Sequence, residues 1–150
     1  MPVAWRIVQE RFVAGAFSGE GARQVDGRWN SRGTAVVYTS EHKSLAALET
    51  LVHVAPKVPV SYRCFRIEFS DALVERLATV PPDWRDEPPN DATRDIGNSW
   101  TREQRSVGLA VPSGVIPEEW NFLLNPAHAD FAKIAIGKPH LFAFDPRLLV

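Results

Sequence analysis

The segment from Val25 to His53 constrains the fold more than any other part of the chain. Its sequence is VDGRWNSRGTAVVYTSEHKSLAALETLVH. The dipeptides Asp26-Gly27 and Arg32-Gly33 predict turns, because glycine adopts positive φ without a Cβ clash. Between the two turns lies Arg28-Trp29-Asn30, so a cation, an aromatic ring and an amide are expected to be held together in a short loop.

A strand and a helix are predicted directly after the second turn. Residues 35–39 form an apolar and β-branched run, which is typical of a buried strand. Ser40 is a favourable helix N-cap, and Glu41 suits the positive end of the helix dipole. The helix is expected to extend to about Val54, because Pro56 follows.

Glu49 lies on the edge of the apolar stripe of this helix, beside Leu45 at about 100° per residue. A carboxylate at the border of a buried stripe is only partly hydrated, so we expect it to have a protein or ligand partner. An ion pair with His53 at i+4, or with an arginine, is one possibility. The other possibility is that Glu49 belongs to a reaction site. The predicted stripe comprises Leu45, Leu48, Leu51 and Val52.

Composition restricts the classes of function. The chain has 150 residues, 45% hydrophobic and 23% charged, which fits one soluble domain spanning 1–150. Its net charge of −1 gives no general attraction to nucleic acid or membrane. Cys64 is the single cysteine, which excludes an intramolecular disulfide and a thiolate zinc cluster. A signal-peptide pattern and a long apolar run are both absent, so we predict a cytoplasmic protein.

The order of the remaining predicted elements indicates the fold class. It is not a strict βαβ alternation, so we predict an α+β domain. Its sheet is expected to be mixed, mostly antiparallel, possibly split, and flanked by helices. We expect loops at 14–24 and 80–90 and helices at 71–78, capped by Ser70, and from Asp91. Strands are predicted at 3–8, 57–69, 108–111, 115–117, 120–124, 133–136 and 140–144.

Several reaction classes lack their motifs. The chain has no G-x-G-x-x-G and no G-x-x-x-x-G-K-[ST], so a Rossmann unit or a Walker loop is not indicated. The histidines are not at zinc-binding spacing, and no metal is predicted. Ser113 lies in Val111-Pro112-Ser113-Gly114, which is not a hydrolase elbow. It does follow a buried strand, where a sheet presents side chains to a cleft, although a plain turn serine is the alternative.

Three ordered blocks of this sequence resemble the RES domain family. The first is residues 27–34 (GRWNSRGT), followed by 37–41 (VYTSE) and the helix with Glu49. The others are 109–113 (LAVPS) and 121–128 (NFLLNPAH). The family is named for an Arg, a Glu and a Ser, which correspond here to Arg28, Glu49 and Ser113. The resemblance extends from about residue 5 to 144, but residues 80–95 carry no family signal.

The resemblance implies a specific activity and specific partners. RES domains are toxins of bacterial toxin–antitoxin pairs, similar in fold to ADP-ribosyltransferases, and they act on NAD. Members deplete NAD by hydrolysis or phosphorolysis and so arrest growth, and some are reported to ADP-ribosylate a protein. The implied partner is an Xre-like antitoxin with a helix-turn-helix region, which covers the cleft of the toxin. A homodimer within that complex is compatible with this assignment, and neither a metal nor a second cofactor is expected.

The chemistry of NAD cleavage assigns a role to each candidate residue. Cleavage of the nicotinamide–ribose bond passes through an oxocarbenium-like state, which a fixed carboxylate such as Glu49 stabilises. Arg28 would bind the pyrophosphate through its planar fork. Tyr38 would stack on nicotinamide or bind the ribose, and Ser113 would bind substrate or hold Glu49. The candidate catalytic residues are Arg28, Tyr38, Glu49 and Ser113, and the candidate NAD-binding residues are Arg28, Trp29, Asn30, Tyr38, Ser113 and Asn125.

Three other functions remain open at this point. A protein ADP-ribosyltransferase would use the same residues and differ only in the nucleophile that reaches the ribose. A nucleic-acid-binding toxin is disfavoured by the net charge and by the absence of a basic stripe. A non-catalytic binding module is disfavoured by the intact set of Arg28, Glu49 and Ser113. The histidines at 42, 53 and 128 are expected to be structural, with proton transfer or phosphate binding as the alternative.

Overall fold

Eight strands form one mixed sheet in the order β4-β5-β6-β2-β1-β3-β7, and β8 pairs with β3 beside β7. The computed structural model describes residues 2–54 and 61–149. Among the described pairs, β4 and β5 run parallel and all others run antiparallel. The predicted α+β class with a mostly antiparallel sheet is therefore confirmed. The strands are β1 Val3–Gln9, β2 Val37–Ser40, β3 Tyr62–Glu68, β4 Val74–Arg76, β5 Gly108–Pro112, β6 Trp120–Leu124, β7 Ala135–Ile136 and β8 His140–Phe142.

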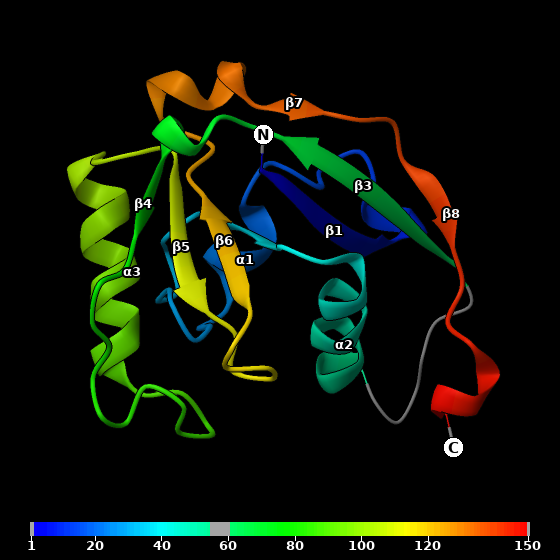
Figure 1. Cartoon of the computed structure of the whole chain (residues 1–150), viewed down its shortest axis with the longest axis horizontal. Coiled ribbons are helices and arrows are strands. Elements are labelled where there is room, and N and C mark those ends of the chain that lie inside the picture. Colours follow the sequence, from blue (N-terminus) through cyan, green and yellow to red (C-terminus); the bar gives the residue numbers. More distant parts are fainter. Residues whose placement is uncertain (1, 55–60, 150) are drawn as a thin grey trace.

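The sheet is curled into two halves that meet between β1 and β2. These strands share a single register pair, Trp5↔Ser40. By contrast, β1 and β3 pair along their whole length, from Val3↔Glu68 to Gln9↔Tyr62. Figure 1 shows β4, β5 and β6 in one half and β1, β3 and β8 in the other, with α2 beside the junction. The possible split of the sheet thus corresponds to the sparse backbone pairing between β1 and β2, whereas the strands within each half are well paired.

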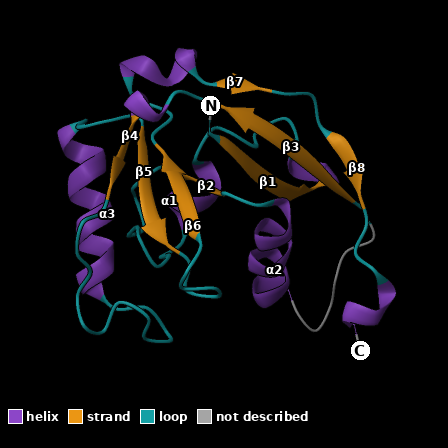
Figure 2. Cartoon of the chain, in the orientation of Figure 1, coloured by secondary structure: helices purple, strands orange, loops and turns teal. Residues whose placement is uncertain are grey.

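Each half of the sheet has its own helix (Figure 2). Helix α2 (Lys43–Val54) packs Ala46 against Ile7, Tyr62 and Cys64 of the β1–β3 half. Helix α3 (Asp91–Glu103) packs Trp100 against Leu123 and other residues of the β5–β6 half. The short helix α1 is Glu20–Gln24, and the 3-10 segments are Glu10–Phe12, Asp71–Leu73, Ala129–Lys133 and Pro146–Leu149. In the described ranges, every helix is too short or too polar to cross a membrane.

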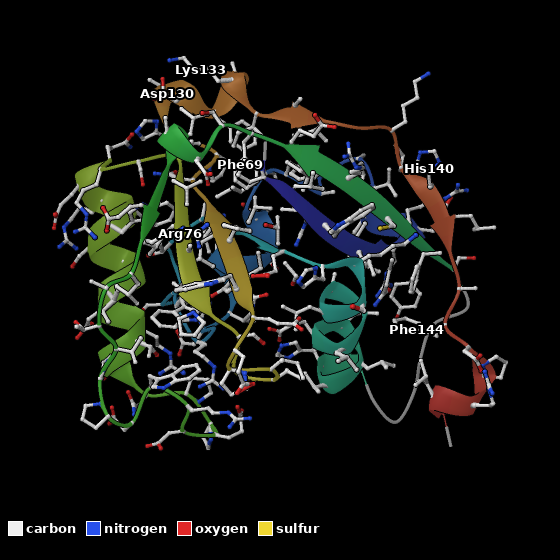
Figure 3. The ribbon with its side chains drawn as sticks, in the orientation of Figure 1. Phe69, Arg76, Asp130, Lys133, His140 and Phe144 are labelled. Carbon is white, nitrogen blue, oxygen red and sulfur yellow. The ribbon has the colours of Figure 1, made fainter. Side chains whose placement is uncertain are left out.

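Aromatic side chains fill the spaces between the elements. Phe69 meets Phe122 edge-on at 5.2 Å between ring centroids, and Phe144 meets Tyr62 in the same way at 5.1 Å. Phe69 and Phe144 are labelled in Figure 3. Phe69 belongs to the cluster that also contains Ile67 and Leu124. Burial of each such ring contributes about 1.5–3 kcal/mol of stability. These contacts hold the strands that carry the polar groups described below.

The helix predicted at 71–78 is wrong. Ser70 caps a 3-10 turn as expected, because its Oγ accepts from the Ala72 amide at 3.2 Å, but the chain then enters β4. Val74 to Arg76 pair in parallel with β5, from Val74↔Gly108 to Arg76↔Ala110. These backbone hydrogen bonds with a distant strand override the local helical spacing of the apolar residues.

The start and the buried face of α2 also differ from the prediction. Ser40 is the last residue of β2 rather than an N-cap, and α2 begins at Lys43. Leu45 and Ala46 are buried, whereas Leu48 and Val52 are 36% and 57% exposed, so the predicted stripe is wrong at these two positions.

Other predicted elements are close to the observed ones. The strands at 3–8, 108–111 and 120–124 and the helix from Asp91 are confirmed. The predicted strand at 115–117 is a turn between β5 and β6, and the predicted loop at 14–24 contains α1. The strands at the C-terminal end are shorter than predicted. Part of the strand predicted at 57–69 lies outside the described residues.

Gly97 sets the distance between α3 and the loop that carries Arg28. A Cβ at this position would lie only 1.7 Å from the carbonyl oxygen of Trp29. Glycine weakens a helix interior, but here it allows close contact between the helix and the loop backbone.

We predict that Gly97→Ala destabilises the protein by about 3 kcal/mol, because helix and loop must separate. Chemical denaturation measures this loss. Gly21→Ala is the matched control, since a Cβ at Gly21 in α1 would meet nothing within 4 Å. It should leave stability unchanged or raise it by about 0.5–1 kcal/mol. Equal stability of the two variants would contradict the account of Gly97.

Candidate active site

Asn30 and Tyr38 build the loop that carries Arg28. Asn30 is fully buried, and its Nδ2 donates to the carbonyl oxygens of Ala22 (2.8 Å) and Val25 (3.2 Å). The Tyr38 hydroxyl donates to Asn30 Oδ1 at 2.5 Å and accepts from the Trp29 amide at 3.2 Å. The loop is thereby tied to β2 through side chains rather than through a backbone ladder.

The Tyr38 hydroxyl is a structural donor and acceptor in this arrangement. Burial is the main cause that raises the pKa of Tyr38 well above its ordinary value, and the nearby charges of Arg28 and Glu49 act in opposite directions. The phenol therefore stays protonated at neutral pH, and its proton is committed to Asn30. The hydroxyl of Tyr38 thus fixes the loop through Asn30 and the Trp29 amide.

Helix α3 holds the other side of the loop. Thr93 donates its hydroxyl proton to the carbonyl of Arg28, and Arg94 Nε donates to the carbonyl of Gly27 at 3.0 Å. Trp29 is 2% exposed and packs in the cluster that contains Trp100. The structure therefore places the Trp29 ring in the core and not beside a surface that a ligand could reach. The contacts made by Thr93 and Arg94 were not predicted, because residues 80–95 carry no recognisable motif.

Arg6 supports the strand that carries Tyr38. Its Nε donates to the carbonyl of Ala16 at 2.7 Å, and its Nη1 donates to the carbonyl of Tyr38 at 2.9 Å. Burial lowers the pKa of Arg6 to about 10, so it remains charged at neutral pH. Arg6 is thus a buried cation that satisfies backbone carbonyls.

The Arg28 guanidinium lies between the 84–87 segment and Gly114. Its Nη1 donates to the carbonyl oxygens of Trp84 and Asp86, both at 2.9 Å. Its Nη2 pairs with Glu87 Oε2 at 2.6 Å. A Cβ on Gly114 would lie 2.8 Å from Arg28 Nε, so the position next to Ser113 must be small.

Glu49 is held through one of its two oxygens. Ser113 Oγ donates to Glu49 Oε2 at 3.0 Å, and Asn121 Nδ2 donates to the same oxygen. Within residues 2–54 and 61–149, no hydrogen bond reaches Oε1. The carboxylate is therefore fixed in orientation while one oxygen remains available to a ligand. The alternative ion pair with His53 does not occur among the described contacts.

Ser113 holds Glu49 and cannot act as a nucleophile in this conformation. The residue is fully buried, and its Oγ accepts from the amides of Val115 and Ile116, both at 3.0 Å. Its single hydroxyl proton is directed to Glu49. Ser113 therefore links the β5–β6 turn to α2.

Asn121 and Ser40 complete the support of Glu49 and were not predicted as site residues. Ser40 Oγ donates to Asn121 Oδ1 at 2.7 Å, which directs the amide nitrogen of Asn121 toward Glu49. Ser40 and Asn121 are register partners on β2 and β6. Asn121 lies in the third family block, but only the strand pairing shows that it faces Glu49.

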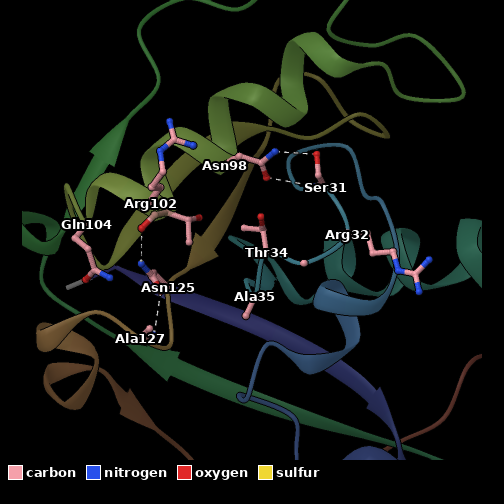
Figure 4. Close-up of a pocket in the computed structure, with 11 residues that line it drawn as sticks. Ser31, Arg32, Thr34, Ala35, Asn98, Arg102, Gln104, Asn125 and Ala127 are labelled. Atoms are coloured by element: carbon pink, nitrogen blue, oxygen red, sulfur yellow. Dashed lines mark hydrogen bonds between the residues drawn. The ribbon is translucent and has the colours of Figure 1, made fainter.

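Asn125 lies at a different place. It is fully buried, its Oδ1 accepts from the Ala127 amide at 3.0 Å, and its Nδ2 donates to the Thr101 carbonyl at 3.3 Å. It lines an open depression of about 510 Å³ between α3 and residues 31–35 (Figure 4). Neither Arg28 nor Glu49 lines this depression.

The histidines make local contacts. His42 is exposed, and its Nε2 lies 3.0 Å from Oε1 of Glu41. His53 is also exposed. His128 caps a 3-10 turn, because its Nδ1 accepts from the Asp130 amide at 2.9 Å. In the part of the chain that the structure describes, no three His, Cys, Asp or Glu side chains lie close enough to share a metal ion.

Both the sequence and the fold are similar to those of known proteins. The model of the RES domain matches residues 3–145. "Toxin Res" of Yersinia enterocolitica is 42% identical over 148 residues, covering 96% of this chain and 97% of the relative. "Prs ADP-ribosylating toxin" of Sphingobium sp. is 37% identical over 153 residues, covering 97% and 95%. A chain of the M. tuberculosis MbcT-MbcA toxin-antitoxin complex has the same fold, with a TM-score of 0.77, 17% identity, and coverage of 98% and 86%.

We predict that Tyr38→Phe lowers stability by about 1–3 kcal/mol, because it leaves Asn30 Oδ1 and the Trp29 amide without their partner. Thermal and urea unfolding measure the change. Tyr62→Phe is the matched control, since the Tyr62 hydroxyl is buried and has no partner among the described residues. That substitution should be neutral or stabilising. The account of the loop fails if the Tyr38 variant is as stable as the control.

Proposed function

The chain belongs to the RES domain family, and from this premise we propose that it is the toxin of a bacterial toxin–antitoxin pair. Its proposed reaction is cleavage of the nicotinamide–ribose bond of NAD, which depletes NAD and arrests growth. The observation that carries the proposal is the one-sided hydrogen bonding of Glu49. Two side chains, Ser113 and Asn121, fix Oε2, and Oε1 is left for a substrate.

Glu49 would act on the ribose. As the bond from ribose C1′ to the nicotinamide nitrogen breaks, its electron pair stays with nicotinamide, which leaves as a neutral molecule. Positive charge develops on the ribose, and a carboxylate already oriented beside it stabilises that charge without reorganising. Water or phosphate then adds to C1′, and in hydrolysis the surplus proton goes to solvent. Ser113 and Asn121 would serve by keeping the carboxylate in place.

Arg28 would bind the pyrophosphate of NAD. The Arg28 guanidinium is permanently charged, and its Nη2 group, which donates to no backbone carbonyl in the described structure, can donate to phosphate oxygens. The carbonyls of Trp84 and Asp86 orient its Nη1 end, so little freedom is lost when an anion binds. The proposal invokes neither a metal nor a second cofactor, because nicotinamide in NAD is already a cationic leaving group.

A second candidate function is ADP-ribosylation of a protein. It is favoured by the 37% identical relative that is named an ADP-ribosylating toxin. The bond that breaks is the same, and a protein side chain replaces water or phosphate as the acceptor. Both candidates therefore require Glu49, and only the product distinguishes them.

The proposed partner is an antitoxin that blocks access to NAD. The structural neighbour from a toxin–antitoxin complex supports this pairing. The Xre-like helix-turn-helix character of that antitoxin, a homodimer within the complex, and a cytoplasmic location are parts of the proposal that the family suggests.

We predict that the purified protein releases nicotinamide from NAD and that Glu49→Gln lowers the rate at least about 100-fold, because the substitution removes the charge opposite the ribose. Chromatography of reactions with and without phosphate identifies the product as ADP-ribose or its 1″-phosphate. Glu10→Gln is the charge-matched control, since Glu10 is exposed and pairs with Arg63. If the folded wild-type protein releases no nicotinamide, NAD depletion is wrong. Labelling of a protein by NAD would then support the second candidate.

We predict that Asn121→Ala lowers kcat about 10- to 100-fold with little change in KM, because Glu49 loses an orienting donor rather than a substrate contact. Asn121→Asp should be at least as inactive, since it places a second carboxylate beside Glu49. Asn98→Ala is the control, because Asn98 makes two hydrogen bonds to Ser31 and none to Glu49. A wild-type kcat in Asn121→Ala would exclude the positioning role.

A further inference from the structure

The segment from Pro81 to Asn90 lies against Arg28. It supplies all the acceptors that the described structure gives the Arg28 guanidinium, namely two carbonyls and the carboxylate of Glu87. The two partners of the ion pair differ in exposure, since the side chain of Arg28 is 16% exposed and that of Glu87 is 75% exposed. An exposed carboxylate is thus paired with a mostly buried guanidinium.

Hydrogen bonds that do not involve Glu87 anchor the segment. It contains two turns, closed by Trp84 N to Pro81 O and by Asp86 N to Asp83 O, both at 3.0 Å. Arg85 Nε donates to the carbonyl of Gly114 at 2.9 Å. Asn90 Nδ2 donates to Asp83 Oδ2 at 2.9 Å. Glu87 is therefore not needed to anchor the segment, and its contact with Arg28 can break while the carbonyl contacts remain.

We propose that Glu87 is a built-in competitor for the anionic part of the substrate. Its carboxylate occupies Nη2 of Arg28 and must withdraw before a phosphate group binds there. The identity of that phosphate as the pyrophosphate of NAD rests on the proposed function, but the competition itself rests only on the contacts of Arg28. The segment thereby sets the affinity of this site for anions.

The donors of Arg28 explain why the two anions compete. Both Nη1 protons are committed to carbonyls, and the Nε side lies against Gly114. The Nη2 group, where Glu87 binds, is therefore the donor that remains for an incoming phosphate. Because Glu87 is 75% exposed, its ion pair with Arg28 is weak, and a doubly charged pyrophosphate group displaces it more readily than a singly charged anion does. Glu87 would therefore favour binding of strongly charged anions to Arg28 over weakly charged ones.

The test is the binding of inorganic pyrophosphate to the full chain, measured by isothermal titration calorimetry. Glu87→Gln retains the size of the side chain and removes its charge, so it should lower the Kd about two- to fivefold, the range expected for loss of an exposed competing pair. Glu10→Gln removes the same charge from another arginine pair and should leave the Kd unchanged. Arg28→Ala should abolish binding. Circular dichroism checks that each variant is folded.

Three outcomes would overturn the proposal. An unchanged Kd in Glu87→Gln would mean that Glu87 does not compete, and a weaker one would mean that it orients Arg28 for the ligand. Absence of pyrophosphate binding in both the wild-type protein and the Glu87→Gln variant would mean that Arg28 is not an anion site. NAD cleavage together with an unchanged Kd rejects this inference and leaves the proposed function intact. Tighter pyrophosphate binding without NAD cleavage rejects the proposed function and supports the inference.

Discussion

The hydrogen bonds from Ser113 and Asn121 to one oxygen of Glu49 are the interaction on which the rest of the site depends. They connect α2 to the β5–β6 half of the sheet, across a junction where β1 and β2 have a single described register pair, Trp5↔Ser40. A helix packed on one half thus presents its carboxylate to groups from the other. A slip of β2 against β6 would move Ser40 away from Asn121 and release the carboxylate.

A second constraint is the loop that carries Arg28. Its shape depends on buried side chains that hold the backbone, including Asn30 and Tyr38, and on Gly97, where α3 comes into contact with the loop. These residues are close to the site in sequence or in space, but their polar atoms are already satisfied within the protein. The groups proposed to contact a ligand are few, chiefly Oε1 of Glu49 and, once Glu87 withdraws, the Nη2 end of Arg28. Such a division between positioning residues and contacting residues is expected where reacting groups must be held rigidly.

Local sequence patterns predicted much of the fold and part of the site. Apolar patterns located β1, β6 and α3, and the family blocks singled out Arg28, Glu49 and Ser113. In the structure Ser113 binds Glu49, and the adjacent Gly114 lies against Arg28. Strand β4 was predicted as a helix because its pairing with β5 is not encoded locally. The support by Ser40 and Asn121 depends on the register of two distant strands. The contact of Glu87 with Arg28 was also missed, because a proline-rich segment has no periodicity from which its position could be predicted.

The most direct test of the central claim is a crystal structure of the Glu49→Gln protein with NAD. The account predicts that the nicotinamide ribose lies against residue 49, with C1′ within about 3–3.5 Å of the side-chain atom that replaces Oε1. The pyrophosphate should lie at Arg28 Nη2, with Glu87 withdrawn. NAD bound with its ribose remote from residue 49, for example in the depression lined by Asn125, would contradict the assignment of Glu49 as the centre of the site.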